Sequence, residues 1–156
     1  MTKETIMVLD TDKNVTWTLK TILESENYPV VIADSVERAS KNFSEFQVAA
    51  FITEYWVKNA ITLNSIRKLK EIWLESYVMV ITDKELREEE YEELIGAGVD
   101  DVFLKPVPIK RVLLYLKKGL RNRRMLIEKN RFDKERINLN PAEGAGVVPK
   151  MEVIPV

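Results

Sequence analysis

Short apolar segments alternate with amphipathic segments along most of the chain. Apolar runs of strand length occupy residues 5–9, 28–33, 48–53, 77–82 and 102–104. Segments with apolar residues at helical spacing occupy residues 14–26, 36–43, 63–73, 85–95 and the stretch from 109 onward. Buried strands that alternate with helices indicate a parallel sheet joined by right-handed crossovers. We therefore expect an α/β fold, a doubly wound five-stranded parallel sheet with helices on both faces.

Polar or charged residues directly follow several of these apolar runs. In doubly wound sheets the working site lies beyond the carboxyl ends of the strands, near the point where the strand order reverses. The residues that this rule selects are Asp10, Thr11, Asp12, Thr53, Glu54, Thr82 and Lys105. The pattern predicts a polar site in which carboxylates lie near a lysine.

The composition excludes several kinds of chemistry. The chain has no cysteine and no histidine, which excludes disulfides, thiolate catalysis, Ser-His-Asp catalysis and the commonest zinc sites. No apolar run approaches the roughly 20 residues that span a bilayer. The N-terminal residues lack the charged-then-apolar pattern of a secretion signal. We expect a cytoplasmic protein that makes no membrane contact.

Charge is distributed unevenly along the chain. Residues 1–108 hold 12 Lys/Arg and 20 Asp/Glu, a net charge of −8, whereas residues 109–136 hold 11 and 3, a net charge of +8. An acidic domain with a basic helix fits a partner-binding protein, and a solvated helix that leans on its own acidic domain fits equally well. Basic residues without interleaved aromatics or a reading motif argue against nucleic acid as the partner.

The C-terminal part predicts an extended last helix and then a tail. Apolar residues continue at helical spacing from Ile109 to about Arg136, and proline, glycine and asparagine cluster beyond that point. Such clusters break helices and favour flexible termini. We expect a domain over residues 1–122, a basic extension of its last helix over residues 123–136 and a flexible tail over residues 137–156.

Residues 98–106 carry a resemblance to a known family. They read Gly-Val-Asp-Asp-Val-Phe-Leu-Lys-Pro, which resembles the Gly-Ala-Asp-Asp-aromatic-x-x-Lys-Pro segment of bacterial two-component response-regulator receiver domains, the CheY-like family. Ile81-Thr82 resembles the switch position after the fourth strand. The resemblance covers residues 5 to about 120. It implies that Thr82 and Lys105 contact a phosphoryl group and that the Lys105–Pro106 peptide is cis.

The resemblance also locates the phosphoacceptor position. Residues 49–56 resemble the strand that carries the family's phosphorylated aspartate, and this match places Glu54 at the acceptor position. An alignment from Phe46-Gln47 upstream places Ile52 there instead. Neither alignment provides an aspartate. We interpret the chain as an atypical receiver, or pseudo-receiver.

Further departures affect the metal site and the switch. Residues 9–12 resemble the acidic cluster that holds Mg²⁺, but Thr11 replaces its second aspartate. Asp10, Asp12 and Glu54 are then the ligands of a vestigial site that binds Mg²⁺ weakly, if it binds a metal at all. Val102 takes the place of the aromatic switch residue. We therefore expect no required cofactor.

Three functions remain open. Receiver phosphorylation needs an aspartate nucleophile and Mg²⁺, and glutamate moves the carboxylate outward by roughly 1.5 Å. The first interpretation is therefore a non-enzymatic signalling module without catalytic residues, which binds a kinase or output protein, or a second copy of itself, without phosphorylation. Glu54 then either pairs directly with Lys105 or marks a dead site. The second interpretation is a Mg²⁺-dependent phosphoacceptor in a phosphorelay, and the third is a nucleic-acid adaptor that uses the basic helix.

Overall fold

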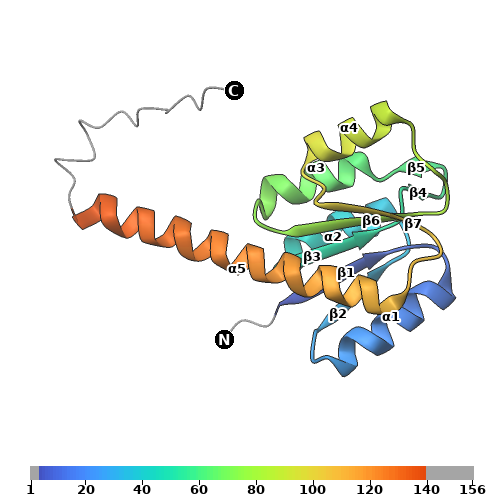
Figure 1. Cartoon of the computed structure of the whole chain (residues 1–156), viewed down its shortest axis with the longest axis horizontal. Coiled ribbons are helices and arrows are strands. Elements are labelled where there is room, and N and C mark those ends of the chain that lie inside the picture. Colours follow the sequence, from blue (N-terminus) through green and yellow to red (C-terminus); the bar gives the residue numbers. More distant parts are fainter. Residues whose placement is uncertain (1–3, 140–156) are drawn as a thin grey trace. The chain divides into compact units, whose positions relative to one another are not determined.

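The computed structural model describes residues 4–139 of the protein (Figure 1). The chain divides into two units, Met1–Arg123 and Arg124–Val156. The sheet of the first unit contains β1 (Thr5–Leu9), β2 (Val30–Ala33), β3 (Val48–Thr53), β6 (Tyr77–Thr82) and β7 (Asp101–Leu104). The helices are α1 (Lys13–Ser25), α2 (Val36–Glu45), α3 (Leu63–Ile72), α4 (Glu88–Ala97) and α5 (Ile109–Leu139), which contributes to both units.

The five long strands form one parallel sheet in the order β2-β1-β3-β6-β7. The chain proceeds from β1 to β2 on one side and then crosses to β3 on the other side. The strand order therefore reverses between β1 and β3, where the ends of these two strands open a crevice. This topology confirms the predicted doubly wound α/β fold with a long last helix.

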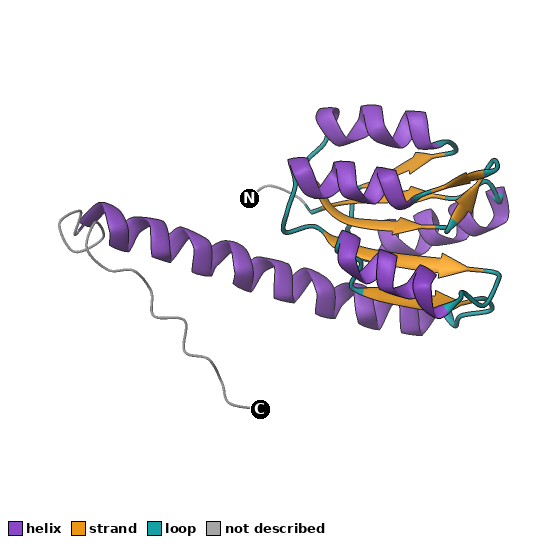
Figure 2. Ribbon diagram, turned by 90° about the horizontal axis from the view of Figure 1, so that it is seen from above, coloured by secondary structure: helices purple, strands orange, loops and turns teal. Residues whose placement is uncertain are grey.

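Alternate residues of each strand pack against opposite layers of helices, which lie on the two faces of the sheet in Figure 2. In β1, Ile6 and Val8 belong to a core that includes Leu19 of α1 and Leu116 of α5. Met7 and Leu9 of β1 face the other layer of helices. They belong to a core that includes Phe43 of α2, Ile66 of α3 and Leu94 of α4. Burial on both faces explains why the strands read as continuous apolar runs.

A short hairpin that the sequence analysis did not predict lies between β3 and α3. It consists of β4 (Trp56–Val57) and β5 (Ala60–Ile61), which pair antiparallel. The two turn residues, Lys58 and Asn59, have φ values of 48° and 62°. Left-handed conformations at both central positions are typical of a type I′ turn, but lysine is an uncommon residue there. An Asn-Gly or Asp-Gly pair would have predicted this turn from the sequence, whereas the Lys-Asn pair does not.

Helix α4 begins later than predicted, at Glu88 rather than Glu85. The Glu90 carboxylate accepts a hydrogen bond from the Arg87 backbone N–H at 3.0 Å, which fixes Arg87 as the residue before the helix. Gly98, with a φ of 103°, ends the helix in the left-handed conformation that glycine adopts without strain. Gly96, in contrast, lies within the helix.

In the second unit, α5 extends to Leu139, slightly past the expected end near Arg136. Every residue from Arg124 to Asn138 is exposed. An ion pair of 3.4 Å joins Arg131 to Glu135 one turn later. The predicted tail beyond residue 139 lies outside the described residues.

Candidate functional site

The carboxyl ends of four strands bring the predicted site residues together. The Glu54 backbone N–H donates to the Leu9 carbonyl at 2.9 Å, so that the residues after β3 and β1 lie side by side. On the other side, the Lys105 N–H donates to the Thr82 carbonyl at 2.7 Å and joins the ends of β7 and β6. Backbone hydrogen bonds therefore place Glu54 and Lys105 at neighbouring strand ends, independently of their side-chain contacts.

Lys105 pairs with two carboxylates. Its Nζ lies 2.7 Å from Glu54 Oε2 and 3.1 Å from Asp10 Oδ2. Both carboxylate side chains are only 8% exposed, and the lysine side chain is 25% exposed. Of the two alternatives considered for Glu54, the structure contains the direct contact with Lys105. The Lys105–Pro106 peptide is cis, as the resemblance implied.

The charge of Lys105 is stabilised by this arrangement. Burial lowers the pKa of Lys105, but hydrogen bonds to Glu54 and Asp10 and the negative charges of both carboxylates outweigh it. The net result is a pKa above the usual value of lysine. The ammonium group is therefore charged at neutral pH and held by two nearby anions.

Both carboxylate oxygens of Glu54 are engaged. Oε2 contacts Lys105, and Oε1 accepts a hydrogen bond from the Tyr55 backbone N–H at 2.9 Å. The backbone around Glu54 is fixed as well, because the fully buried hydroxyl of Thr62 donates to the Glu54 carbonyl at 2.8 Å. The Glu54 carboxylate is therefore held in one position, between Lys105 after β7 and the Tyr55 N–H of its own loop.

The other acidic residues of the predicted cluster have different partners. Asp10 Oδ1 accepts from the Asp12 N–H at 2.9 Å. The Asp12 carboxylate accepts from the Asn14 N–H at 2.9 Å and caps the start of α1. Within residues 4–139, no group of three or more acidic side chains is placed to hold a metal ion. The structure thus unites Asp10 and Glu54 through Lys105 and assigns Asp12 to a helix cap.

The remaining predicted positions lie around this site. Thr82 is fully buried, and its hydroxyl accepts from the Lys84 N–H at 3.3 Å. Val102 pairs with Val80 in the sheet and packs against the core on the α2–α4 side. Ile52 is 2% exposed within the opposite core. The alternative alignment would therefore place a core residue at the acceptor position, whereas Glu54 lies at the strand end.

Tyr55 and Thr62 support the site but were not selected from the sequence. Tyr55 is 2% exposed, and its carbonyl accepts from the Thr62 N–H at 3.0 Å. Tyr55 directly follows Glu54 at the end of a predicted strand, and this position could have marked it as a site residue. The spacing of seven residues between Tyr55 and Thr62 was not informative, because the intervening hairpin was not predicted.

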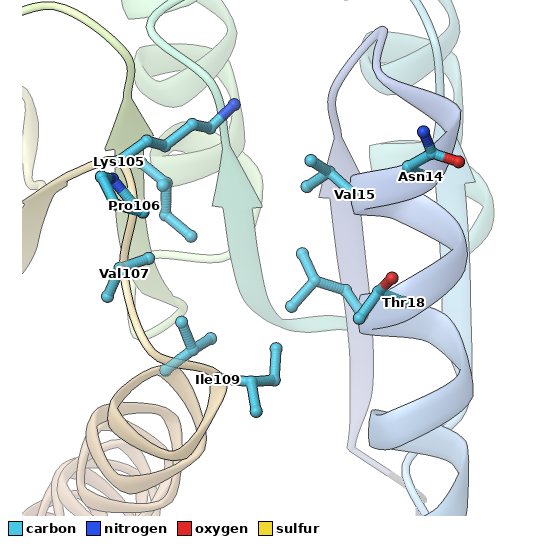
Figure 3. A pocket seen from close by; sticks show the side chains of 10 residues that line it. Asn14, Val15, Thr18, Lys105, Pro106, Val107 and Ile109 are labelled. Carbon is cyan, nitrogen blue, oxygen red and sulfur yellow. The ribbon is translucent and has the colours of Figure 1, made fainter.

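An apolar pocket of about 440 Å³ lies beside Lys105, between α1 and the segment that joins β7 to α5. Figure 3 shows Lys105 and Asn14 at one end of the pocket and Ile109 at the other. The remaining lining residues are Val15, Thr18, Leu19, Ile81, Pro106, Val107 and Val112. A pocket of this size and lining accommodates an apolar group next to the charged site.

Comparisons with solved structures agree with the fold. The CheY-like receiver domain protein from Methanospirillum hungatei has a TM-score of 0.75 and 19% identity, over 80% of this chain and 98% of that chain. The beryllofluoride-activated NtrC4 receiver domain dimer has a TM-score of 0.70 and 26% identity, over 76% and 98%. A response regulator from Burkholderia pseudomallei with a phosphorylated aspartic acid, a calcium ion and citrate has a TM-score of 0.68 and 18% identity, over 93% and 88%.

The sequence comparison defines the family. No curated protein matches the chain, and within residues 4–139 no helix is apolar over a length that could cross a bilayer. The model of the response regulator receiver domain matches residues 6–117, which is most of the chain. The matched residues include the whole sheet except Thr5, and both residues of the Glu54–Lys105 pair. The chain therefore belongs to the response regulator receiver family.

Proposed function

We propose that this receiver domain signals by protein–protein interaction, without phosphorylation of Glu54 and without enzymatic activity. The observation that carries the proposal is the engagement of both Glu54 oxygens, one by Lys105 Nζ at 2.7 Å and one by the Tyr55 N–H at 2.9 Å. A nucleophilic carboxylate needs a free oxygen in line with the incoming phosphorus. Glu54 instead holds Lys105 as a phosphoryl group would, with a single negative charge.

The residues present do not fit a Mg²⁺ ion, so we propose that the domain needs no cofactor. Mg²⁺ requires near-octahedral oxygen ligands at about 2.0–2.1 Å. The Lys105 ammonium contacts Asp10 and Glu54, two of the three expected ligands, and Asp12 caps α1. A divalent cation would have to displace the ammonium from both carboxylates. Thr11 supplies a hydroxyl where a further carboxylate would be needed.

The partner that we propose is a signalling protein, either a kinase or an output protein. The pocket beside Lys105 provides an apolar recess next to the charged site, a combination that fits an amphipathic protein surface. Self-association is the second form of the same proposal, since one similar structure is described as a receiver domain dimer. The cytoplasmic location stays a prediction.

The experiment that tests this function is incubation of the full chain with acetyl phosphate and Mg²⁺, followed by intact-mass measurement. We expect no added phosphoryl group. A matched Glu54→Gln variant under the same conditions identifies any label on Glu54. A phosphoryl mass that appears in the wild type and disappears in this variant would establish the Mg²⁺-dependent phosphoacceptor function instead.

A further inference from the structure

Thr62 links the loop that contains Glu54 to the start of α3. It is fully buried, and its hydroxyl donates a hydrogen bond to the Glu54 carbonyl at 2.8 Å and lies 3.3 Å from the Tyr55 carbonyl. Its N–H donates to the Tyr55 carbonyl at 3.0 Å, and its own carbonyl accepts from the Ile66 N–H at 3.0 Å, in the first turn of α3. The backbone of Thr62 therefore belongs to the helix start, whereas its side chain belongs to the site.

The Thr62 hydroxyl does not cap its own helix. A threonine directly before a helix ordinarily accepts a hydrogen bond from an N–H two or three residues later. Asp12 and Ser35 do this for α1 and α2, with the N–H groups of Asn14 and Arg38 at 2.9 and 3.2 Å. Thr62 makes no such bond, and its φ of −80° and ψ of 3° are not the extended values of a capping residue. The hydroxyl is directed at the Glu54 loop instead.

The peptide group between Glu54 and Tyr55 is held on both of its sides. Its carbonyl oxygen accepts from the Thr62 hydroxyl, and its N–H donates to Glu54 Oε1 at 2.9 Å. Because a peptide group is planar and rigid, the direction of its carbonyl fixes the direction of its N–H. The N–H holds Oε1, and Oε2 of the same carboxylate lies 2.7 Å from Lys105 Nζ. A rotation of this peptide plane would therefore take away the donor that orients the carboxylate.

Two threonine hydroxyls donate to the Glu54 carbonyl, but they differ in what they attach it to. The Thr53 hydroxyl lies 2.9 Å from this oxygen and comes from the adjacent residue of the same strand end. Thr62 lies eight residues later in the sequence, and its backbone is fixed by the first turn of α3. Of these two donors, Thr62 is therefore the one that anchors the peptide group to another element of the fold.

We infer that Thr62 is a positioning residue that directs the Glu54 carboxylate to Lys105 through the plane of the Glu54–Tyr55 peptide. With the hydroxyl in place, Oε1 is held by the loop and Oε2 pairs with the ammonium group. Without the hydroxyl, the carbonyl loses its anchor on α3, the peptide plane turns, and Lys105 retains Asp10 alone of its two carboxylates. The inference rests on the proposed function, because it names the residue that maintains the pairing of an unphosphorylated Glu54.

The test measures the pKa of Lys105 in the full chain, by NMR titration with ¹³C-labelled lysine and with Lys105→Met to identify the signal. Thr62→Val keeps the shape of the side chain and removes the hydroxyl. Thr62→Ala removes it without placing a methyl group against two carbonyl oxygens. In both variants the pKa of Lys105 should fall by about one unit, as for the loss of one of two neighbouring opposite charges. Thr62→Ser keeps the hydroxyl and should preserve the wild-type pKa.

Thr16→Val is the matched control for loss of a threonine hydroxyl. Thr16 is buried as well, and its hydroxyl donates to the Lys13 carbonyl of its own helix at 3.2 Å. This variant should leave the pKa of Lys105 unchanged. An equal fall in Thr16→Val would assign the effect to general loosening of the fold and overturn the inference. An unchanged pKa in both Thr62→Val and Thr62→Ala would overturn it too.

Glu54→Gln separates failure of this inference from failure of the proposed function. It removes the carboxylate charge itself, so it should also lower the pKa of Lys105. If Glu54→Gln lowers this pKa and the two Thr62 variants do not, the pair exists without help from Thr62, and the inference alone fails. An unchanged pKa in Glu54→Gln would instead remove the ion pair that carries the proposed function.

Discussion

The ion pair between Glu54 and Lys105 is testable by removing either charge. Glu54→Gln keeps the shape of the side chain and should lower the free energy of unfolding by about 1–3 kcal/mol, because Lys105 loses one of two buried partners. Lys105→Met should have a similar effect, since it leaves two carboxylates without their cation. Chemical denaturation of both single variants provides the measurement.

The double variant shows whether Glu54 and Lys105 stabilise the domain together or independently. If the two residues act together, Glu54→Gln combined with Lys105→Met should be little less stable than either single variant. Additive losses of stability in this cycle would show that Glu54 and Lys105 contribute independently, and that Glu54 is a tolerated replacement.

Glu54→Asp alone should not create a phosphorylated protein. The shorter side chain restores the ordinary acceptor, but Thr11 still lacks a carboxylate and Asp12 still caps α1. Intact mass after incubation with acetyl phosphate and Mg²⁺ should therefore show no phosphoryl group. Labelling of this single variant would mean that one carboxylate from Asp10 and one from residue 54 are sufficient to place the metal.

Tyr55 should make the stability of the domain depend on alkaline pH. Burial, and secondarily the hydrogen bond to Glu90, raises the pKa of Tyr55 to about 12. Because the folded state holds a proton that the unfolded state loses above its ordinary pKa of about 10, the free energy of unfolding should fall between pH 10 and 12. A shift of this size corresponds to about 2–3 kcal/mol.

The Tyr55→Phe variant isolates this contribution. Burial also raises the pKa of Tyr77, so the comparison must be the difference between wild type and variant across the same pH range. We expect a smaller fall of stability in Tyr55→Phe, measured by denaturant unfolding at several pH values. Parallel curves for the two proteins would contradict the raised pKa.

The packing of α5 on the sheet requires a glycine at one position. A Cβ on Gly119 would lie 2.1 Å from Cδ1 of Tyr77 in β6. Gly119→Ala should therefore lower the free energy of unfolding by about 1–3 kcal/mol, through displacement of the ring or the helix. Gly96 in α4 is the matched control, because nothing lies within 4 Å of its added Cβ. Gly96→Ala should leave the stability unchanged or raise it. Thermal unfolding of both variants and the wild type provides the measurement.

The elements that the sequence predicted well are those whose burial dictates their pattern. Strands covered on both faces must be apolar throughout, and the helix that ends at Gly98 needs a residue tolerant of positive φ. The hairpin at Trp56–Ile61 was missed because two-residue strands have no periodicity. Its turn places Lys58 and Asn59 at positive φ, and the lysine in this pair does not predict such a conformation.

The structure brings three residues of the predicted site together, whereas their hydrogen-bond connections could not be predicted. Asp10, Glu54 and Lys105 follow from the rule that strand ends converge, because topology alone places them together. Assignment of Asp12 to the cap of α1 depends on the local turn geometry.

The second unit should govern assembly of the whole molecule. The exposed part of α5 carries five large apolar side chains, Met125, Leu126, Ile127, Phe132 and Ile137. Helices of about 15 residues are marginal in water without packing, so a partner surface would stabilise this segment. We expect the full chain to form oligomers of more subunits than a chain that ends at Arg123. Light scattering after size-exclusion chromatography measures this, with each molar mass divided by that of its own chain.

The truncated chain serves as its own folding control. It retains the buried Leu116 and Leu120 and the pair between Arg123 and Glu4 at 3.5 Å. Its thermal unfolding should therefore remain cooperative. If the truncated and full chains have the same number of subunits in solution, the segment from Arg124 onward has no part in self-association, and an acidic partner becomes the alternative to test.

The three tryptophans give the unlabelled protein an optical reporter. Trp17 in α1 is 68% exposed and Trp56 in the hairpin is 43% exposed, whereas the Trp73 indole donates to the Phe43 carbonyl at 2.9 Å. Trp56 lies two residues after Glu54, and its ring meets that of Tyr55 edge to face, with centroids 5.8 Å apart. In a Trp17→Phe background, the iodide-quenchable fluorescence should come mainly from Trp56. Its emission would then follow ligand arrival at the hairpin in real time.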